Sequence, residues 1–379
     1  MLDPLKLNDL KILMKECMQN DVALMDELRD EVEVLKNGVK KINPRTSTAI
    51  SLVGTDGGNN NLEFDPFIVH VIRVVDSNGV EYYMDVITPT TPISKIDNKI
   101  KDGNNKGYNS LRQMMDALNV ESISKLSPMI RERKRGEPVK TSWIQAYREL
   151  VEWATLFSLI KNKNYGSDTI IVFDGLLRSK VFSGDLFHKL KNELQRLIEE
   201  RYTTTGCKIY IVGVAKHSKV LDRYRLVMHT DGIMKTKYPC YAEVPRLMEE
   251  KSYIWAEYAR DDDYAGAEVN KYVAGKMFFV KFGDQKDDPI WPVDILTSQL
   301  RDSDKIISYL MNDAIYGFPI PWYPLCLQKA HENSALFDFD MDLIRDSMTN
   351  AIREAMGEEK ENFDSFLFAN SDTTGRRYG

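Results

Sequence analysis

The sequence predicts an α/β protein built on a mixed β-sheet that helices flank. Three observations predict it: closely spaced strand patterns early in the chain, two later apolar strands that a helix separates, and helical patterns around them. Strands joined by tight turns pair antiparallel, whereas strands joined through a helix commonly pair parallel in one sheet. The 379 residues suffice for one large α/β domain or two smaller ones.

The first part of the chain, from about residue 4 to 40, carries apolar residues at helical spacing with charges between them. This pattern is typical of one long amphipathic helix or a helix pair. Such a segment packs on the core of its own chain or pairs with a second copy. The Asn43-Pro44-Arg45 stretch ends it, so we expect residues 1–45 to form a separate helical segment.

Three strand patterns follow, and we expect them to pair antiparallel. Asn78-Gly79, between the second and the third, is a strong hairpin signal. The patterns are Ala49–Gly54, Phe67–Val75 and Val80–Ile87. Residues 89–110 are rich in Pro, Asn, Asp, Lys and Gly, and this composition predicts a mobile loop.

Helices and strands alternate in the next part of the chain. Helical patterns run to about residue 132 and from Trp143 to Lys161, and a buried strand covers Asp168–Gly175. A helix over about 185–201 leads to the strand Lys208–Val214, and another helix begins near Lys216. Three antiparallel strands, helix, strand, helix, strand is the order of a ribonuclease-H-like mixed sheet.

The remaining residues extend this core. Residues 230–294 predict an irregular β insertion that includes Ser252–Glu257 and Lys276–Phe282. Helical patterns cover about 295–315 and 324–337, so we expect the main domain to span residues 46–340. Residues 341–379 predict a charged helix and a polar tail that is partly disordered.

Two predicted strands end in the same way, with a carboxylate followed by glycine. The segments are Val53-Gly-Thr-Asp56-Gly-Gly and Ile171-Val-Phe-Asp174-Gly-Leu. A single such Asp most often caps a turn or helix. Two of them on neighbouring strands would repel each other and favour a divalent cation, and oxygen ligands favour Mg²⁺ or Mn²⁺ over zinc.

A third acid is expected on the helix before the second strand, which offers Glu149 and Glu152. Glu152 lies among the core positions Trp153, Leu156 and Phe157, so we favour it over Glu149. Later in the chain, His331 is a candidate nitrogen ligand or proton-transfer group, although a lone His on a helix is usually structural. Lys216 directly follows an apolar strand and is a candidate phosphate contact.

Composition restricts the function classes. The formal charge of −6 argues against a protein that coats nucleic acid, but not against an enzyme with one basic groove. The basic run Arg131–Arg135 is either a solvated helix end or a DNA-guiding patch. The four cysteines are scattered, which predicts neither disulfides nor a zinc site. Without a signal peptide or a membrane-spanning run, we expect a cytoplasmic protein that does not bind membranes.

These motifs together resemble the NurA nuclease family. The resemblance rests on the Asp56 and Asp174 strand ends, the helix with Glu152, the segment Val212-Gly-Val-Ala-Lys216, and Tyr323-Pro-Leu followed by Ala330-His331. It covers roughly residues 49–340. Gly58 departs from the family, in which a serine more usually follows Asp-Gly.

The resemblance implies a ribonuclease-H-like homodimer that uses two Mn²⁺ (or Mg²⁺) ions to degrade DNA from the 5′ end and to cut single strands. It implies Asp56, Glu152, Asp174 and His331 as metal ligands, and Lys216 near the scissile phosphate. It also implies a partner, a HerA-like hexameric ATPase, in DNA end resection and repair or in antiviral defence against phage. This chain itself has no Gly-x-x-x-x-Gly-Lys phosphate loop with which to move DNA.

Two alternatives remain open. One is a non-catalytic assembly subunit of an ATPase complex, although such a subunit would tend to have lost Asp56 or Asp174. The other is a ribonuclease-H-like nuclease acting on RNA, because the metal chemistry is the same for both nucleic acids.

Overall fold

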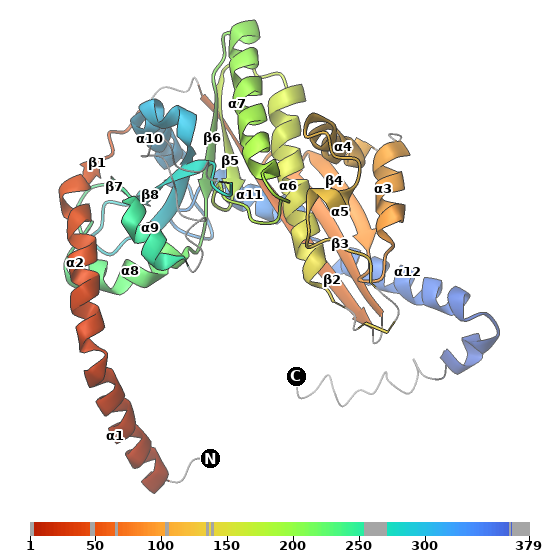
Figure 1. The fold of residues 1–379 in the computed structure, drawn as a ribbon, viewed down its shortest axis with the longest axis horizontal. Coiled ribbons are helices and arrows are strands. Elements are labelled where there is room, and N and C mark those ends of the chain that lie inside the picture. The colour runs from red at the N-terminus through yellow and green to blue at the C-terminus, as the bar shows by residue number, and fades with distance from the viewer. Residues whose placement is uncertain are drawn as a thin grey trace.

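The computed structural model describes residues 4–45, 50–64, 67–102, 106–133, 136–137, 140–253, 271–363 and 365. These residues form one nine-stranded mixed sheet with helices on both faces (Figure 1). The strands are β1 (Lys40–Lys41), β2 (Ile50–Phe64), β3 (Phe67–Asp76), β4 (Glu81–Ile87), β5 (Asp168–Asp174), β6 (Ile209–Val214), β7 (Cys240–Glu243), β8 (Gly275–Lys281) and β9 (Ile290–Leu296). Their order across the sheet is β1-β7-β8-β9-β6-β5-β2-β3-β4.

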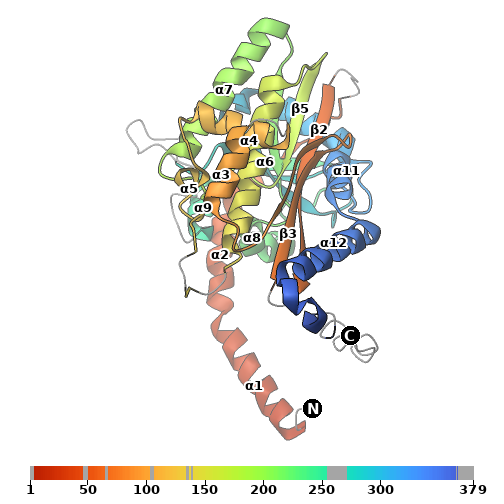
Figure 2. The ribbon, with the colours of Figure 1, turned by 90° about the vertical axis from the view of Figure 1, so that its right-hand side faces the viewer.

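The helices form a layer on each face of this sheet. The α-helices are α1 (Pro4–Asn20), α2 (Val22–Gly38), α3 (Ile93–Asp102), α4 (Lys106–Ala117), α5 (Ile123–Leu126), α6 (Ser142–Asn162), α7 (Leu186–Thr205), α8 (Lys219–Thr230), α9 (Arg246–Ser252), α10 (Ser303–Ala314), α11 (Leu325–Ser334) and α12 (Asp338–Met356). The 3₁₀ turns among the described residues are Thr297–Asp302 and Gly357–Glu359. Figure 2 shows α3, α4 and α6 on one face of β2 and β3, and α11 on the other.

The sheet topology confirms the predicted fold class. β2, β3 and β4 pair antiparallel in sequence order, and β5 and β6 join parallel to β2. The resulting order β4-β3-β2-β5-β6 is the ribonuclease-H-like order that the sequence predicts. β9, β8 and β7 continue the sheet antiparallel beyond β6, so the predicted β insertion extends the main sheet.

Both faces of the central strands are buried, which explains their continuous apolar sequences. In β5, Ile171 and Phe173 pack in the cluster formed with α6 and α7. Ile170 and Val172 point to the opposite face and pack with residues of α10 and α11. The alternation fixes the strand register, so the end of β5 delivers Asp174 at a defined position.

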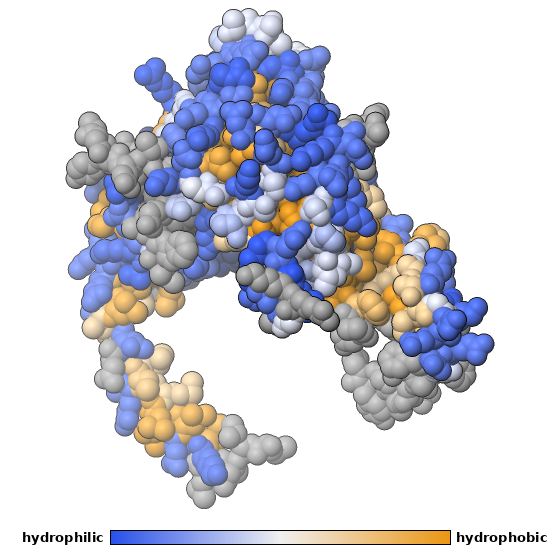
Figure 3. Space-filling model, turned by 45° about the vertical axis from the view of Figure 1, so that its right-hand side comes forward, coloured by the Kyte–Doolittle hydropathy of each residue, from blue (hydrophilic) through white to orange (hydrophobic). Residues whose placement is uncertain are grey.

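The N-terminal segment forms a helix pair rather than one helix. Leu28, Val32 and Leu35 of α2 are buried against α8 and the β7–β8 strands. α1 projects away from this body and exposes apolar side chains along its length (Figures 1 and 3). Leu10, Leu13 and Met18 are among the exposed residues of α1.

Two sequence-based boundaries are wrong. β2 does not end near Asp56 but runs to Phe64, because β3 supplies hydrogen-bond partners for the whole Gly-Gly-Asn-Asn-Asn stretch despite its low strand propensity. Residues 89–110 are not a loop. They contain α3 and the start of α4, since Ile93, Ile96 and Ile100 share one helix face and are buried in the core.

Other predictions shift or fall outside the described residues. β9 ends at Leu296, so the helix expected from about 295 begins later, as a 3₁₀ turn followed by α10. Ser252 ends α9, and the rest of the strand predicted at Ser252–Glu257 lies mostly outside the described residues. The same holds for Lys134 and Arg135 of the basic run and for the tail after residue 365. In the described residues we find no helix with the length and apolarity to span a lipid bilayer.

Candidate active site

The candidate site lies where β2 passes the end of β5. The parallel pairing of the two strands stops at Thr55 and Phe173, and the next residues in each strand are Asp56 and Asp174. β2 continues along β3 alone, so its Asp56 lies beside the end of β5 rather than at a strand end of its own. The two carboxylates therefore share one edge of the sheet.

Helix α11 holds Asp56 from one side. His331 Nδ1 lies 2.6 Å from Asp56 Oδ2, and Ser334 Oγ donates a hydrogen bond of 3.3 Å to the same oxygen. His331 is 275 residues away along the chain, and its own side chain is 65% exposed. The imidazole can therefore orient Asp56 and still face solvent or substrate.

Glycine allows α11 to approach β2 this closely. A Cβ on Gly54 would lie 2.4 Å from the carbonyl oxygen of Cys326, and a Cβ on Gly58 would lie 2.7 Å from that of Ser334. Both distances are closer than any ordinary contact, so a larger residue would push the helix away. Gly58, where the sequence resemblance leads us to expect a serine, thus permits the close packing of the helix end that carries Ser334.

Asp174 is held by residues that follow β6 and precede α11. Tyr323 donates a hydrogen bond of 3.0 Å from its hydroxyl to Asp174 Oδ1, and Lys216 Nζ lies 3.9 Å from Oδ2. Burial raises the pKa of Asp174, and the neighbouring charge of Asp56 raises it further. Lys216 and the Tyr323 hydroxyl oppose this rise because both favour the ionised carboxylate.

Glu152 completes the group of acids from α6. Its Oε1 lies 3.2 Å from Arg148 Nε, one helical turn earlier. Burial raises the pKa of Glu152 well above its usual value, against the opposing charge of Arg148. The charges of Asp56 and Asp174 add to the rise.

Glu149 lies outside this group. It accepts a hydrogen bond of 2.5 Å from Ser179 Oγ, and burial raises its pKa. It does not line the cleft that Glu152 lines with Asp56 and Asp174. The geometry therefore favours Glu152, the residue that its core-facing position on the helix predicts.

The five sequence-predicted residues line one open cleft of about 540 Å³. They are Asp56, Glu152, Asp174, Lys216 and His331. Arg148, His217, Asn60 and Ser334 line the same cleft and were not predicted. The contact of Arg148 with Glu152 could have been predicted from the sequence, because Arg148 stands four residues before Glu152 on the same helix. The contacts of Tyr323 and Ser334 could not have been predicted from the sequence, because they depend on packing between residues far apart in the chain.

The donor set fits an oxygen-ligated divalent cation, with one condition. Three carboxylates and one imidazole line the cleft, and burial, together with repulsion between the carboxylates, raises the pKa of Glu152 and of Asp174. Within the described ranges, no three His, Cys, Asp or Glu side chains are spaced closely enough to hold an ion as they stand. Ion binding would thus require the carboxylates to turn from Arg148 and Lys216 toward one another and toward His331.

Comparisons with known proteins gave structural neighbours only. No family model and no curated protein matches this chain. The crystal structure of the NurA nuclease from Sulfolobus solfataricus is 14% identical, covers 94% of this chain and 99% of its own, and has a TM-score of 0.41. A structure of NurA bound to dAMP and manganese is 10% identical, covers 86% and 94%, and has a TM-score of 0.36. Solved structures of NurA nucleases are thus among those that this chain resembles, which is the resemblance that the motifs predict.

Proposed function

We propose that this chain is a metal-dependent nuclease that hydrolyses phosphodiester bonds in DNA. One observation carries the proposal: Asp56, Glu152 and Asp174 converge on one cleft at the edge of a ribonuclease-H-like sheet, with His331 against Asp56. Buried carboxylates are costly without a charge partner, and three of them in one cleft favour a cation. Phosphodiester hydrolysis is the reaction for which such oxygen-rich sites are suited.

Asp56, Glu152 and Asp174 would hold the metal, with His331 completing the site. When bound, Mn²⁺ or Mg²⁺ would polarise the phosphoryl group and lower the pKa of a bound water. Carboxylate oxygens favour these ions over zinc. The use of two ions is part of the proposal and rests on the motif resemblance.

The remaining residues of the cleft would position these groups and the substrate. Tyr323 fixes the carboxylate of Asp174 through its hydroxyl. The ammonium of Lys216 lies 3.9 Å from Asp174. Once a cation neutralises that carboxylate, the ammonium would form its ion pair with a substrate phosphate instead. His331 orients Asp56 through Nδ1, and its ring is exposed to solvent.

The finer parts of the proposal rest on the motif resemblance. They are degradation from the 5′ end, cutting of single strands, a HerA-type hexameric translocase as partner, and a role in DNA end processing or phage defence. A homodimer is also proposed. The exposed apolar side chains of α1 support it, because a solvated helix rarely presents such a surface without a partner.

The test is cleavage of an end-labelled DNA strand by the purified full-length chain. We expect cleavage with Mn²⁺, weaker cleavage with Mg²⁺, and none after chelation with EDTA. An RNA strand of the same sequence serves as the comparison and should be cleaved more slowly. Equal cleavage with and without EDTA would contradict the metal-dependent mechanism, and preferential RNA cleavage would contradict the DNA assignment.

A further inference from the structure

We propose that a second cleft, beside the candidate active site, binds one unpaired nucleotide of the substrate strand. Its base would lie on Trp291 and the neighbouring apolar side chains, and its phosphate would contact Arg225 and His217. The inference rests on the proposed function, because the strand would enter this cleft from the scissile position.

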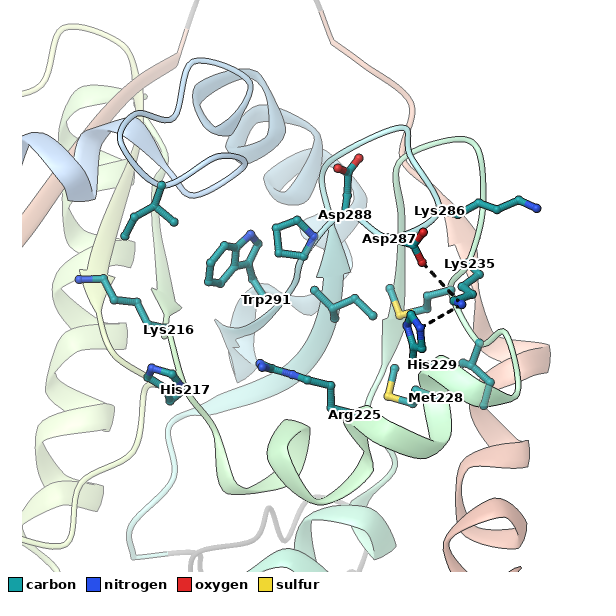
Figure 4. Close-up of a pocket in the computed structure, with 15 residues that line it drawn as sticks. Lys216, His217, Arg225, Met228, His229, Lys235, Lys286, Asp287, Asp288 and Trp291 are labelled. Atoms are coloured by element: carbon teal, nitrogen blue, oxygen red, sulfur yellow. Dashed lines mark hydrogen bonds and ion pairs between the residues drawn. The ribbon is translucent and has the colours of Figure 1, made fainter. Parts of the chain in front are cut away.

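The two clefts adjoin each other and share two lining residues. The second has a volume of about 440 Å³, and Lys216 and His217 line both. Figure 4 shows these two residues on one side of it and Arg225 and His229, from α8, along its lower edge. A strand whose phosphate lies at Lys216 therefore has its next nucleotide within reach of the second cleft.

The floor of the second cleft is apolar and contains an aromatic ring. Trp291, Met228 and Met234 line it and are almost fully buried. The indole Nε1 of Trp291 is buried and has no hydrogen-bond partner among the described residues. A nucleobase suits such a surface, since it presents a flat apolar face to the apolar side chains.

Trp291 is also linked to the acids. Its ring packs edge-on against Tyr323, with 4.9 Å between centroids, and the Tyr323 hydroxyl donates to Asp174. Lys216 Nζ lies 5.6 Å from the centroid of the same tyrosine ring. Trp291 thus contacts the tyrosine that holds Asp174, and the second cleft adjoins the acids through that tyrosine.

The rim of the cleft is basic in a chain whose net charge is −6. Lys235 is already engaged with His229 at 3.2 Å and Asp287 at 3.5 Å, as the dashed lines in Figure 4 show. Arg225 has a weaker ion pair, 3.9 Å from Asp222, and its side chain is 57% exposed. Its guanidinium points across the cleft toward His217 (Figure 4).

His217 and Lys286 form no ion pair or hydrogen bond within the described part of the chain. Arg225 and His217 offer donors for a strand phosphate, whereas the Lys286 ammonium points away from the cleft (Figure 4). A duplex keeps its bases stacked inside the helix, so a base reaches this apolar floor only from an unpaired or flipped-out strand. The cleft therefore selects single-stranded DNA near the cut.

Strand binding in EDTA tests this without requiring cleavage. Fluorescence polarisation would compare an oligothymidine strand with an abasic strand of the same length on the full chain. We expect the natural strand to bind about tenfold more tightly, in line with the stacking of one base. A free deoxynucleoside monophosphate should compete far more weakly than the strand.

Two variants test whether the strand binds at this cleft. Arg225→Ala should weaken binding of both strands about fivefold and lower the slope of log affinity against log salt by about one. Its matched control is Arg345→Ala, which removes an arginine of similar exposure paired with the acid three residues earlier, and it should change nothing. Trp291→Leu should abolish the preference for the natural strand, with its melting temperature checked first.

Equal affinity for natural and abasic strands would overturn the proposal, as would equal behaviour of the Arg225 and Arg345 variants. A monophosphate that competes as strongly as the strand would overturn the assignment to a strand. Base-dependent binding at Arg225 and Trp291 without any Mn²⁺-dependent cleavage would contradict the proposed nuclease while leaving this cleft in place.

Discussion

Glu152 and Glu149 lie three residues apart on α6 and have different surroundings. Glu152 faces the cleft with Asp56 and Asp174, whereas Glu149 accepts a hydrogen bond from Ser179. Both have raised pKa values because both are buried. Burial alone therefore does not distinguish the proposed metal ligand from Glu149, whereas the neighbouring acids do.

This difference gives a matched pair of variants. Glu152→Gln removes a carboxylate that we propose as a metal ligand, and it should lower the rate of Mn²⁺-dependent cleavage by about 10³-fold, which is ~4 kcal/mol in activation free energy. Glu149→Gln keeps an acceptor for Ser179 and should stay within about threefold of the wild-type rate. Single-turnover rates measure both, and the reverse ranking would assign the ligand to Glu149.

At the scale of elements, the site depends on how closely α11 packs against β2. The helix supplies His331 and Ser334, and Gly54 provides the room for its backbone. Gly166 offers a comparison, because a Cβ there would meet nothing within 4 Å.

Gly54→Ala should therefore displace α11 and lower stability by about 2 kcal/mol, as overpacking of a tight contact commonly does. The displacement would carry His331 away from Asp56, so cleavage should fall as well. Gly166→Ala should leave both properties near those of the wild type. Thermal unfolding and cleavage rates check this, and an unchanged Gly54→Ala protein would show that the contact is not needed.

A second contact between elements joins helix α2 to helices α8 and α9 through the carboxylate of Glu31. Tyr224 donates to Glu31 Oε2 at 2.5 Å, and Lys251 donates to Oε1 at 2.9 Å. Burial raises the pKa of Glu31, but these hydrogen bonds and the charge of Arg223 outweigh it, so the pKa is lowered. A lowered folded-state pKa means that the ionised carboxylate stabilises the fold above its ordinary value of 4.5.

This contribution should be lost as the pH falls below about 4.5 and through the folded-state pKa. Glu31→Ala should cost about 1–3 kcal/mol at neutral pH and less in acid, where the wild type has lost it too. Glu33→Ala on the same helix, with its side chain 61% exposed, is the control and should be nearly neutral. Melting temperatures of the wild type and the Glu31 variant between pH 3 and 7 measure this loss of stability. An equal loss at pH 3 and at pH 7 would contradict the role of the ionised carboxylate.

At the scale of the whole molecule, the order of strands and helices could be predicted from local patterns, and the contacts that build the site could not. The apolar runs of β5 and β6 and the helical spacing of α6 are visible in sequence. The extension of β2 past Asp56 is not, because β3 imposes it on residues that disfavour strands.

For the candidate site, too, the individual residues could be predicted from the sequence and the contacts between them could not. Asp56 and Asp174 follow recognisable strand motifs, and the position of Glu152 follows from one helix face. The hydrogen bond between Asp56 and His331 joins residues 275 positions apart, and only the packing of α11 establishes it. Arg148 was readable from its spacing to Glu152, whereas Tyr323 and Trp291 became functional candidates only through their places beside Asp174 and the second cleft.

The Mn²⁺-dependent cleavage rate of Asp56→Asn is the most direct measure of whether these carboxylates form a nuclease site. Asparagine preserves the shape of Asp56 and can still pair with His331 and Ser334, so the melting temperature should change little. The single-turnover rate on single-stranded DNA should fall by about 10³-fold or more. A folded Asp56→Asn protein that cleaves within about tenfold of the wild-type rate would contradict the assignment.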